Sequence, residues 1–138
     1  MKMHTTNYQN TFIEVAEDCP AVMGEVPPLK GDSRTVANMQ FDLLQKHPYH
    51  YTSDDVLFQV YADRNDLTEK EYKEAREQFF SKGQPCLRTS PLAKRYGWGV
   101  HHDEKGRIAL YGCESPEYKK LVKDGSLKVV KAMKNAKK

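Results

Sequence analysis

The sequence predicts an α+β fold: a small mixed sheet with helices packed on it, in the order β-α-β-α-β-β-α. Three observations support this prediction. Short β-branched or alternating apolar segments recur along the chain, helix-capping signals precede apolar residues at helical spacing, and turn residues separate the two kinds of segment. Elements mixed in this way are typical of helices that cover a small sheet. No repeat or linker divides the 138 residues, so we expect a single domain spanning residues 1–138.

The first part of the chain supplies a strand and a helix. Residues 12–16 (FIEVA) are short and rich in β-branched side chains, which predicts the first strand. Prolines and glycines between residues 20 and 31 then prevent regular structure. Asp32 or Ser33 is expected to cap a helix that runs to about His47, because a proline follows that histidine.

The middle of the chain predicts a central strand and a second helix. Residues 56–62 (VLFQVYA) are apolar on both alternating faces, which favours a strand covered on both sides. Thr68 and Glu71 then have the spacing of a capping box, in which each side chain bonds the other residue's backbone amide. The helix that they start is expected to run to about Lys82, and Gly83 is a good left-handed terminator.

The last part of the chain predicts a β-hairpin. Segments 97–102 and 107–113 flank the sequence DEKG, which has the composition of a hairpin loop at residues 103–106. With that loop, alternate side chains of the two strands share one face: Trp98, Val100 and His102 with Ala109, Tyr111 and Cys113.

Helical structure is expected to finish the chain. Ser115 and Pro116 supply an N-cap and a proline in the first turn of a helix that Asp124 and Gly125 end. A lysine-rich helical tail is predicted at about 126–138.

Composition limits the class of protein. Hydrophobic residues make up 38% of the chain and charged residues 30%, which is ordinary for a soluble globular protein. The longest apolar runs are far shorter than a membrane span, and the N-terminal sequence MKMHTTNYQN lacks a signal peptide's apolar core. The three cysteines are widely spaced and form no CxxC pair. We therefore expect a cytoplasmic protein with reduced thiols and no membrane partner.

The net charge of +3 conceals an uneven distribution. Residues 119–138 hold eight lysines against one aspartate, whereas residues 1–118 hold 14 basic and 18 acidic side chains. A nucleic-acid-binding protein normally concentrates basic residues on its folded surface. The acidic body therefore argues against nucleic acid as a partner, and the lysines of the tail are expected to form a solvated face.

One segment within the acidic body has the composition of a binding site. Residues 78–102 contain four basic side chains and no acid, together with two histidines and the chain's single tryptophan. Arginines can bind carboxylate or phosphate, and aromatic side chains can stack on a ring. The proposed ligand-binding residues are Arg88, Lys94, Arg95, Tyr96, Trp98, His101 and His102. The predicted function is binding of an anionic, ring-bearing small molecule, and no glycine-rich phosphate fingerprint specifies a nucleotide.

Other side chains of the sequence could support other functions. A metal site would need His47 and His50 to meet a third ligand, but a proline separates them, so no metal or cofactor is expected. Cys86 lies in a basic neighbourhood and could act as a nucleophile with a histidine as base, but no signature orders these residues. Whether the protein is an enzyme is therefore left open. The alternative function is a protein–protein interaction or homo-oligomerisation module, anchored by the ring-rich connector 47–51 and the hairpin.

Three segments together carry a resemblance to a known family. They are TTNYQNTFIEVAEDCP, HPYHYTSDDVLFQVYADRN and FFSKGQPCLRTSPLAKRYGWGVHH. The chain resembles an uncharacterised family of small microbial proteins that is classed as the domain of unknown function 6157. The resemblance implies a single-domain, cytoplasmic-type protein. It implies no activity, substrate or catalytic residue.

Overall fold

Residues 3–136, which the computed structural model describes, form a four-stranded mixed sheet and five α-helices. The strands are β1 (Thr11–Glu14), β2 (Trp98–His102), β3 (Ile108–Gly112) and β4 (Lys128–Lys131), in the order β3-β2-β1-β4. The helices are α1 (Val36–Lys46), α2 (Ser53–Arg64), α3 (Glu69–Phe79), α4 (Pro91–Lys94) and α5 (Pro116–Lys123), with a short 3-10 turn η1 (Leu87–Thr89) before α4. This confirms the predicted α+β class.

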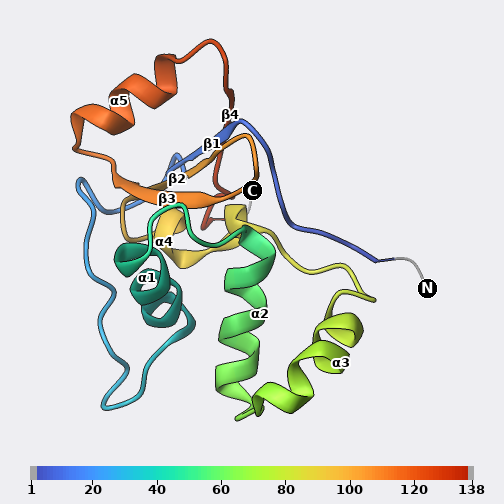
Figure 1. Cartoon of the computed structure of the whole chain (residues 1–138). Coiled ribbons are helices and arrows are strands. Elements are labelled where there is room, and N and C mark those ends of the chain that lie inside the picture. The colour runs from blue at the N-terminus through green and yellow to red at the C-terminus, as the bar shows by residue number, and fades with distance from the viewer. Residues whose placement is uncertain (1–2, 137–138) are drawn as a thin grey trace.

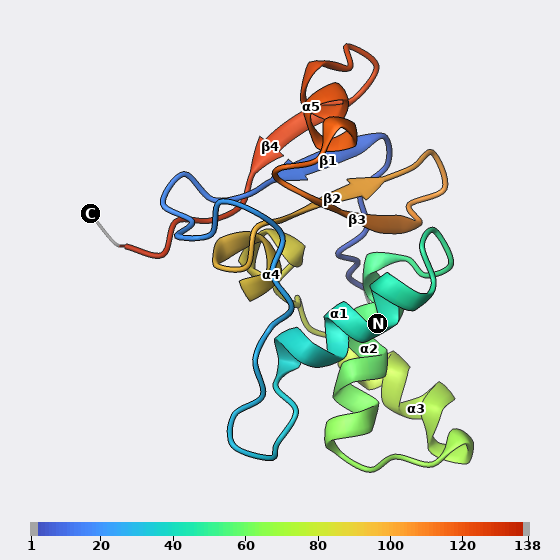
Figure 2. The same cartoon turned by 90° about the vertical axis from the view of Figure 1, so that its left-hand side faces the viewer.

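The sheet separates two unequal layers of helix (Figure 1). Helix α5 covers part of one face, and α1 and α4 lie on the other (Figure 2). Helices α2 and α3 extend away from the sheet on the α1 side. No helix within residues 3–136 has the length and apolar character needed to cross a bilayer.

The hairpin is confirmed, but its predicted register is wrong by one residue. Val100 pairs with Leu110 and His102 with Ile108, so these two residues of β3 share a face with Val100, where Ala109 and Tyr111 were predicted. The turn takes in Arg107 because the carboxylate of Asp103 accepts hydrogen bonds from the backbone amides of both Lys105 and Arg107.

Most of the helix boundaries depend on side-chain caps. Helix α3 begins at the predicted capping box of Thr68 and Glu71, and the last helix begins at Ser115 as expected. The cap of the first helix is Thr35, not Asp32 or Ser33, since Thr35 and Asn38 bond each other's backbone amides.

The predicted strand at 56–62 is wrong: these residues form most of helix α2. Thr52 and Asp55 form a capping box at its start. Val56 packs in the main core with α1, whereas Phe58 packs with Phe80 in a second cluster beside α3. The helix is therefore apolar on more than one side, and its sequence lacks the single apolar stripe of a surface helix.

The predicted lysine-rich helical tail is also wrong within the described residues. Residues 128–131 form strand β4, which runs parallel to β1 at the edge of the sheet. Lys128 and Lys131 are exposed, which is a common way for an edge strand to avoid pairing with another chain. Residues 137–138 of the predicted tail lie outside the described part of the chain.

Candidate functional site

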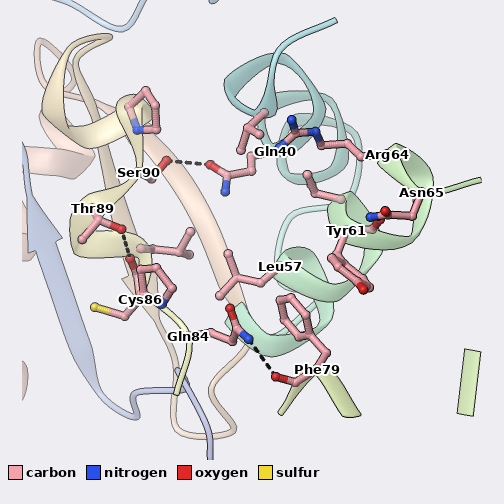
Figure 3. A pocket seen from close by; sticks show the side chains of 15 residues that line it. Gln40, Leu57, Tyr61, Arg64, Asn65, Phe79, Gln84, Cys86, Thr89 and Ser90 are labelled. Atoms are coloured by element: carbon pink, nitrogen blue, oxygen red, sulfur yellow. Dashed lines mark hydrogen bonds between the residues drawn. The ribbon is translucent and has the colours of Figure 1, made fainter. Parts of the chain in front are cut away.

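A cavity of about 530 Å³ lies between α1, α2 and the segment 84–91 (Figure 3). Helix α1 contributes Val36 and Gln40, which are one turn apart. Helix α2 contributes one face of three successive turns: Leu57, Val60, Tyr61 and Arg64. Phe79 at the end of α3 and the segment 84–91 complete the walls.

Gln40 provides a fixed polar group in this mostly apolar cavity. Its side chain is almost fully buried, with 3% of the residue exposed. Its Oε1 accepts a hydrogen bond of 2.6 Å from the Ser90 hydroxyl. Its Nε2 has no acceptor among residues 3–136, and Figure 3 shows this nitrogen turned away from Ser90 into the cavity. Gln40 therefore presents an unused donor to whatever occupies the space.

Two further polar side chains line the same cavity. Gln84 donates from Nε2 to the carbonyl oxygen of Phe79 at 2.7 Å, which leaves its Oε1 as an unused acceptor. Arg64 makes no ion pair with any described residue, and its side chain reaches from α2 toward α1 (Figure 3). Of the described residues that line the cavity, Arg64 is the charged one and none is acidic.

None of the seven residues predicted to bind a ligand lines this cavity. The basic ones hold the C-terminal segment instead. Arg88 donates from Nε to the carbonyl of Lys131 at 2.8 Å. Arg95 donates to the amide oxygen of Asn135 at 3.3 Å, and Asn135 donates to the carbonyl of Lys94 at 2.8 Å. The three basic residues therefore all contact the segment 131–135, which begins at the last residue of strand β4.

The two predicted stacking residues are covered by an N-terminal loop. Trp98 donates from its indole nitrogen to the carbonyl of Glu25 at 2.8 Å and packs against Phe41, with ring centroids 5.4 Å apart. The backbone of Tyr96 accepts a hydrogen bond from the Glu25 amide. Trp98 therefore has partners on both sides without any ligand.

The two histidines lie on opposite faces of β2, as the sequence predicted. His101 bonds the Tyr49 hydroxyl through Nδ1 at 2.8 Å, and that hydroxyl also bonds Tyr111 at 2.7 Å. Burial lowers the pKa of His101 and, together with the Tyr111 bond, raises that of Tyr49. His101 and Tyr49 are therefore neutral near pH 7, and their hydrogen bonds, with that of Tyr111, fix the connector before α2 to the sheet.

His102 lies on the other face and is fully buried. Its ring packs edge-on against Tyr8, with ring centroids 5.3 Å apart. Neither ring nitrogen has a hydrogen-bond partner among residues 3–136. Burial lowers the pKa of His102 to about 4, and the nearby backbone carbonyl of Val100 offsets this only in part.

Metal and nucleophile chemistry find little support in the geometry. No group of three metal-ligating side chains converges within the described residues. Cys86 bonds the Tyr8 hydroxyl at 3.3 Å, and Figure 3 shows its sulfur pointing away from the centre of the cavity. The cysteine therefore faces the N-terminal segment and not a bound molecule.

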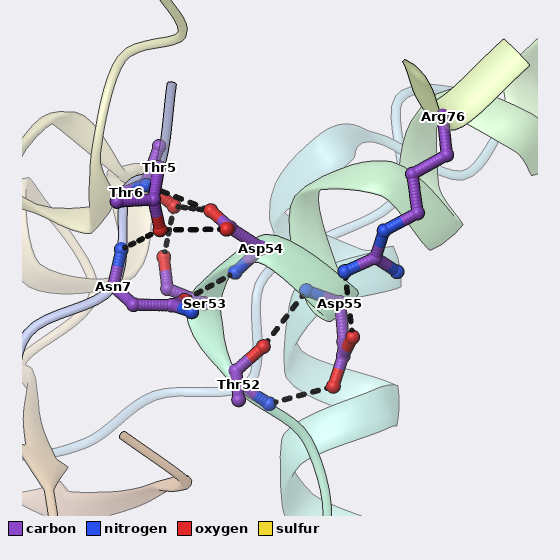
Figure 4. A network of polar contacts seen from close by, with 8 residues as sticks. All are labelled: Thr5, Thr6, Asn7, Thr52, Ser53, Asp54, Asp55 and Arg76. Carbon is purple, nitrogen blue, oxygen red and sulfur yellow. Dashed lines mark hydrogen bonds and ion pairs between the residues drawn. The ribbon is translucent and has the colours of Figure 1, made fainter. Parts of the chain in front are cut away.

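A second polar cluster joins the N-terminal segment to the start of α2 (Figure 4). The buried carboxylate of Asp54 accepts hydrogen bonds from the Thr5 hydroxyl and from both the amide and the hydroxyl of Thr6, each at 2.7 Å. In return, Asn7 accepts from the Asp54 amide at 2.9 Å. These groups find their hydrogen-bond partners within the protein, so the cluster holds the N-terminal segment against the start of α2.

An Asp54→Asn variant is expected to lose roughly 2 kcal/mol of unfolding free energy, because the new amide group faces donors and leaves some of them unpaired. Urea unfolding measures this loss, and faster protease cleavage within residues 3–8 should accompany it. Asp63→Asn is the matched control, since Asp63 is exposed and its carboxylate accepts a hydrogen bond from Gln59 alone among the described residues. Equal stability of the two variants would contradict the structural role of Asp54.

The α2 wall of the cavity was missed because residues 56–62, which include Leu57, Val60 and Tyr61, were interpreted as a strand. As a helix, residues 57, 60, 61 and 64 have the spacing of one face. The signal that could have found them is the Thr52–Asp55 capping box, which has the same form as the one recognised at Thr68.

These observations define a class: an α+β domain with a helix-walled cavity on the α1 side of its sheet. The chain belongs to a family of unknown function (DUF6157), whose sequence profile matches residues 3–138. This confirms the resemblance noted from the sequence. No curated protein and no solved structure matches the chain.

Proposed function

We propose that the protein binds a small molecule with a ring and an anionic group in the cavity between α1, α2 and the segment 84–91. The observation behind this proposal is an apolar cavity of about 530 Å³ lined by an arginine without an ion pair and an amide donor without an acceptor among residues 3–136. Ligand sites in proteins typically enclose roughly 300–1,000 Å³, with apolar walls and few polar groups. The proposal keeps the predicted ligand class but moves its site.

The walls favour a ring. Tyr61 and Phe79 both line the cavity, and their ring centroids lie 4.7 Å apart at an interplanar angle of 40°. A flat molecule can pack against such aromatic side chains. The unopposed charge of Arg64 favours a carboxylate or a similar anion, which a guanidinium can bind through two parallel hydrogen bonds.

The first test uses anilinonaphthalene sulfonate, a fluorescent aromatic anion. An Arg64→Glu variant is expected to bind this probe about tenfold more weakly than the parent, because reversing an exposed charge costs about 1–2 kcal/mol of binding free energy. Fluorescence titration measures the dissociation constants at one salt concentration. Arg95→Glu is the matched control, since Arg95 is exposed and does not line the cavity. Equal affinities of the two variants would remove Arg64 from the site.

A second candidate function is an interaction module, and a different observation favours it. The loop that covers Trp98 exposes several apolar side chains, including Val22 and Val26 at 84% and 70%. Such residues can anchor a protein interface. If this loop is the functional surface, the protein self-associates, and a Val22→Ser, Val26→Ser variant sediments as a monomer while it still binds the anionic probe.

The proposal also includes a cytoplasmic location and excludes nucleic acid. Cys19, Cys86 and Cys113 are free thiols, which fits a reducing compartment. The acidic excess of residues 1–118 opposes binding to a polyanion.

A further inference from the structure

We infer that Gln40 determines the ligand specificity of the cavity, and that the ligand's head group is a carboxylate bound between the Gln40 amide and Arg64. The inference rests on the proposed function, because it assigns a chemical class to a ligand of that same cavity. It depends on three features: the fixed orientation of Gln40, the opening of its nitrogen to the cavity, and the distribution of charge around it.

The orientation of Gln40 is set by the start of α4. Ser90 caps this helix, and its hydroxyl oxygen accepts a hydrogen bond from the Leu92 amide at 3.2 Å. The hydroxyl proton of Ser90 is then available to the side chain of Gln40, 2.6 Å away. This proton needs an acceptor, so the carbonyl oxygen of Gln40 faces Ser90 and its amide nitrogen faces the opposite way.

The nitrogen opens to the cavity. In the described part of the chain, two side-chain nitrogen or oxygen atoms are inaccessible to solvent and have no hydrogen-bond partner. They are the two ring nitrogens of His102. Gln40 Nε2 also lacks an acceptor among the described residues. It differs from the His102 nitrogens because Gln40 lines the cavity and its nitrogen points into that space (Figure 3). A buried donor without a partner is unfavourable, so this position selects a ligand that supplies an acceptor.

The charges around the cavity select the kind of acceptor. Arg64 supplies a cation from α2, and none of the described residues that line the cavity offers a carboxylate that would compete for it. A carboxylate has two oxygens, one for the Gln40 amide and one for the guanidinium. Leu57 and Phe79 then accommodate the apolar body, and Gln84 Oε1 can accept a hydrogen bond from the distal end. The ligand class is an apolar, ring-bearing carboxylic acid.

The experiment compares three probes of similar shape: naphthoate, acetylnaphthalene and isopropylnaphthalene. The ketone differs from the hydrocarbon by one acceptor, and naphthoate adds the charge. Dissociation constants come from the probes' own fluorescence and from displacement of anilinonaphthalene sulfonate. The quantity to compare between the parent and each variant is the ratio of ketone affinity to hydrocarbon affinity. The free ketone is better hydrated than the free hydrocarbon, but this difference is the same for every variant and cancels in the comparison.

Two variants of Gln40 make the test specific. Gln40→Met removes the donor at similar volume and is expected to lower the ketone-to-hydrocarbon ratio about tenfold. Gln40→Glu keeps an oxygen for Ser90 and presents a second oxygen to the cavity. It is expected to weaken naphthoate binding more than tenfold and to leave isopropylnaphthalene unchanged. The isosteric Gln40→Glu variant keeps the test decisive if the methionine variant does not fold.

The outcomes separate the two proposals. If all three probes bind and their ratios are the same in the parent and both variants, Gln40 does not set specificity, and the cavity proposal stands alone. If none of the probes binds the parent protein, both proposals fail. A changed ketone ratio with unchanged hydrocarbon affinity supports the role of Gln40, since a merely structural defect weakens all probes together.

Discussion

A Gly97→Ala variant is expected to lose about 3–5 kcal/mol of unfolding free energy, a large part of the stability of a domain of this size. Gly97 has a φ of 79°, in the left-handed region where a β-carbon is strained. A β-carbon there would also overlap the backbone carbonyl of Met23. This carbonyl belongs to the loop that covers Trp98, and a backbone atom cannot move aside as a flexible side chain can.

Urea unfolding, followed by the fluorescence of Trp98, measures the effect of the Gly97 substitution. Gly125→Ala is the matched control, because a β-carbon at Gly125 meets nothing within 4 Å and its φ is not positive. Its stability should stay within about 0.5 kcal/mol of the parent. A loss of less than about 1 kcal/mol at Gly97 would mean that the loop does not pack on Trp98 as described.

Local signals in the sequence were sufficient for several elements. The capping box at Thr68, the cap and proline at Ser115, and the turn between β2 and β3 each involve residues close in sequence, so their geometry follows from local chemistry. The register error of the hairpin had an equally local cause. Asp103 can bond amides two and four residues ahead, and composition alone did not show which residue closes the loop.

Helix α2 was misassigned because it packs on two sides. Val56 faces the main core and Val60 lines the cavity, while Phe58 and Ala62 belong to the cluster with α3. Each pair has the four-residue spacing of one helix face. Along the sequence the residues of the two faces interleave, so that an apolar residue stands at every second position from 56 to 62. This is also the pattern of a strand. Tertiary packing, and not local preference, decides between the two structures.

Strand β4 and the basic segment depend on contacts between distant parts of the chain. Residues 128–131 are a strand because they pair with residues 11–14, and nothing in their own sequence, two valines between two lysines, identifies that partner. The arginines at 88 and 95 were predicted to bind an anion, since an arginine's charge suggests an anionic partner. Both instead bond uncharged oxygens of the C-terminal segment. Sequence shows which donors exist, but the fold determines which acceptors they meet.

A His102→Phe variant is expected to be as stable as the parent within about 1 kcal/mol at pH 7 and more stable than the parent at pH 4. At pH 7 the buried imidazole is neutral and its ring nitrogens make no hydrogen bond with the described residues. Replacing it with the nearly isosteric phenyl ring therefore removes no hydrogen bond. At acid pH the parent pays a cost that the variant does not, because His102 can take up a proton and phenylalanine cannot.

The direction of this effect follows from the two pKa values. The folded protein has a His102 pKa of about 4, whereas an unfolded histidine titrates near 6.5. Between these values the unfolded chain binds a proton that the folded protein does not, so the parent's stability falls as the pH falls from 6.5 toward 4. The full difference corresponds to roughly 3 kcal/mol, and no screening by solvent reduces it because the ring is fully buried.

Urea midpoints of parent and variant at pH 7, 5.5 and 4 measure this linkage. Subtracting the two curves removes the contributions of groups that both proteins share. His101 is one such group, with its own lowered pKa, and Asp18, whose pKa is lowered to about 2 by hydrogen bonds from Asn135 and Ala136, is another. A difference that stays constant across the three pH values would show that water or a shifted partner reaches the imidazole of His102. In that case the contact between β2 and Tyr8 is looser than the edge-on packing of the two rings implies.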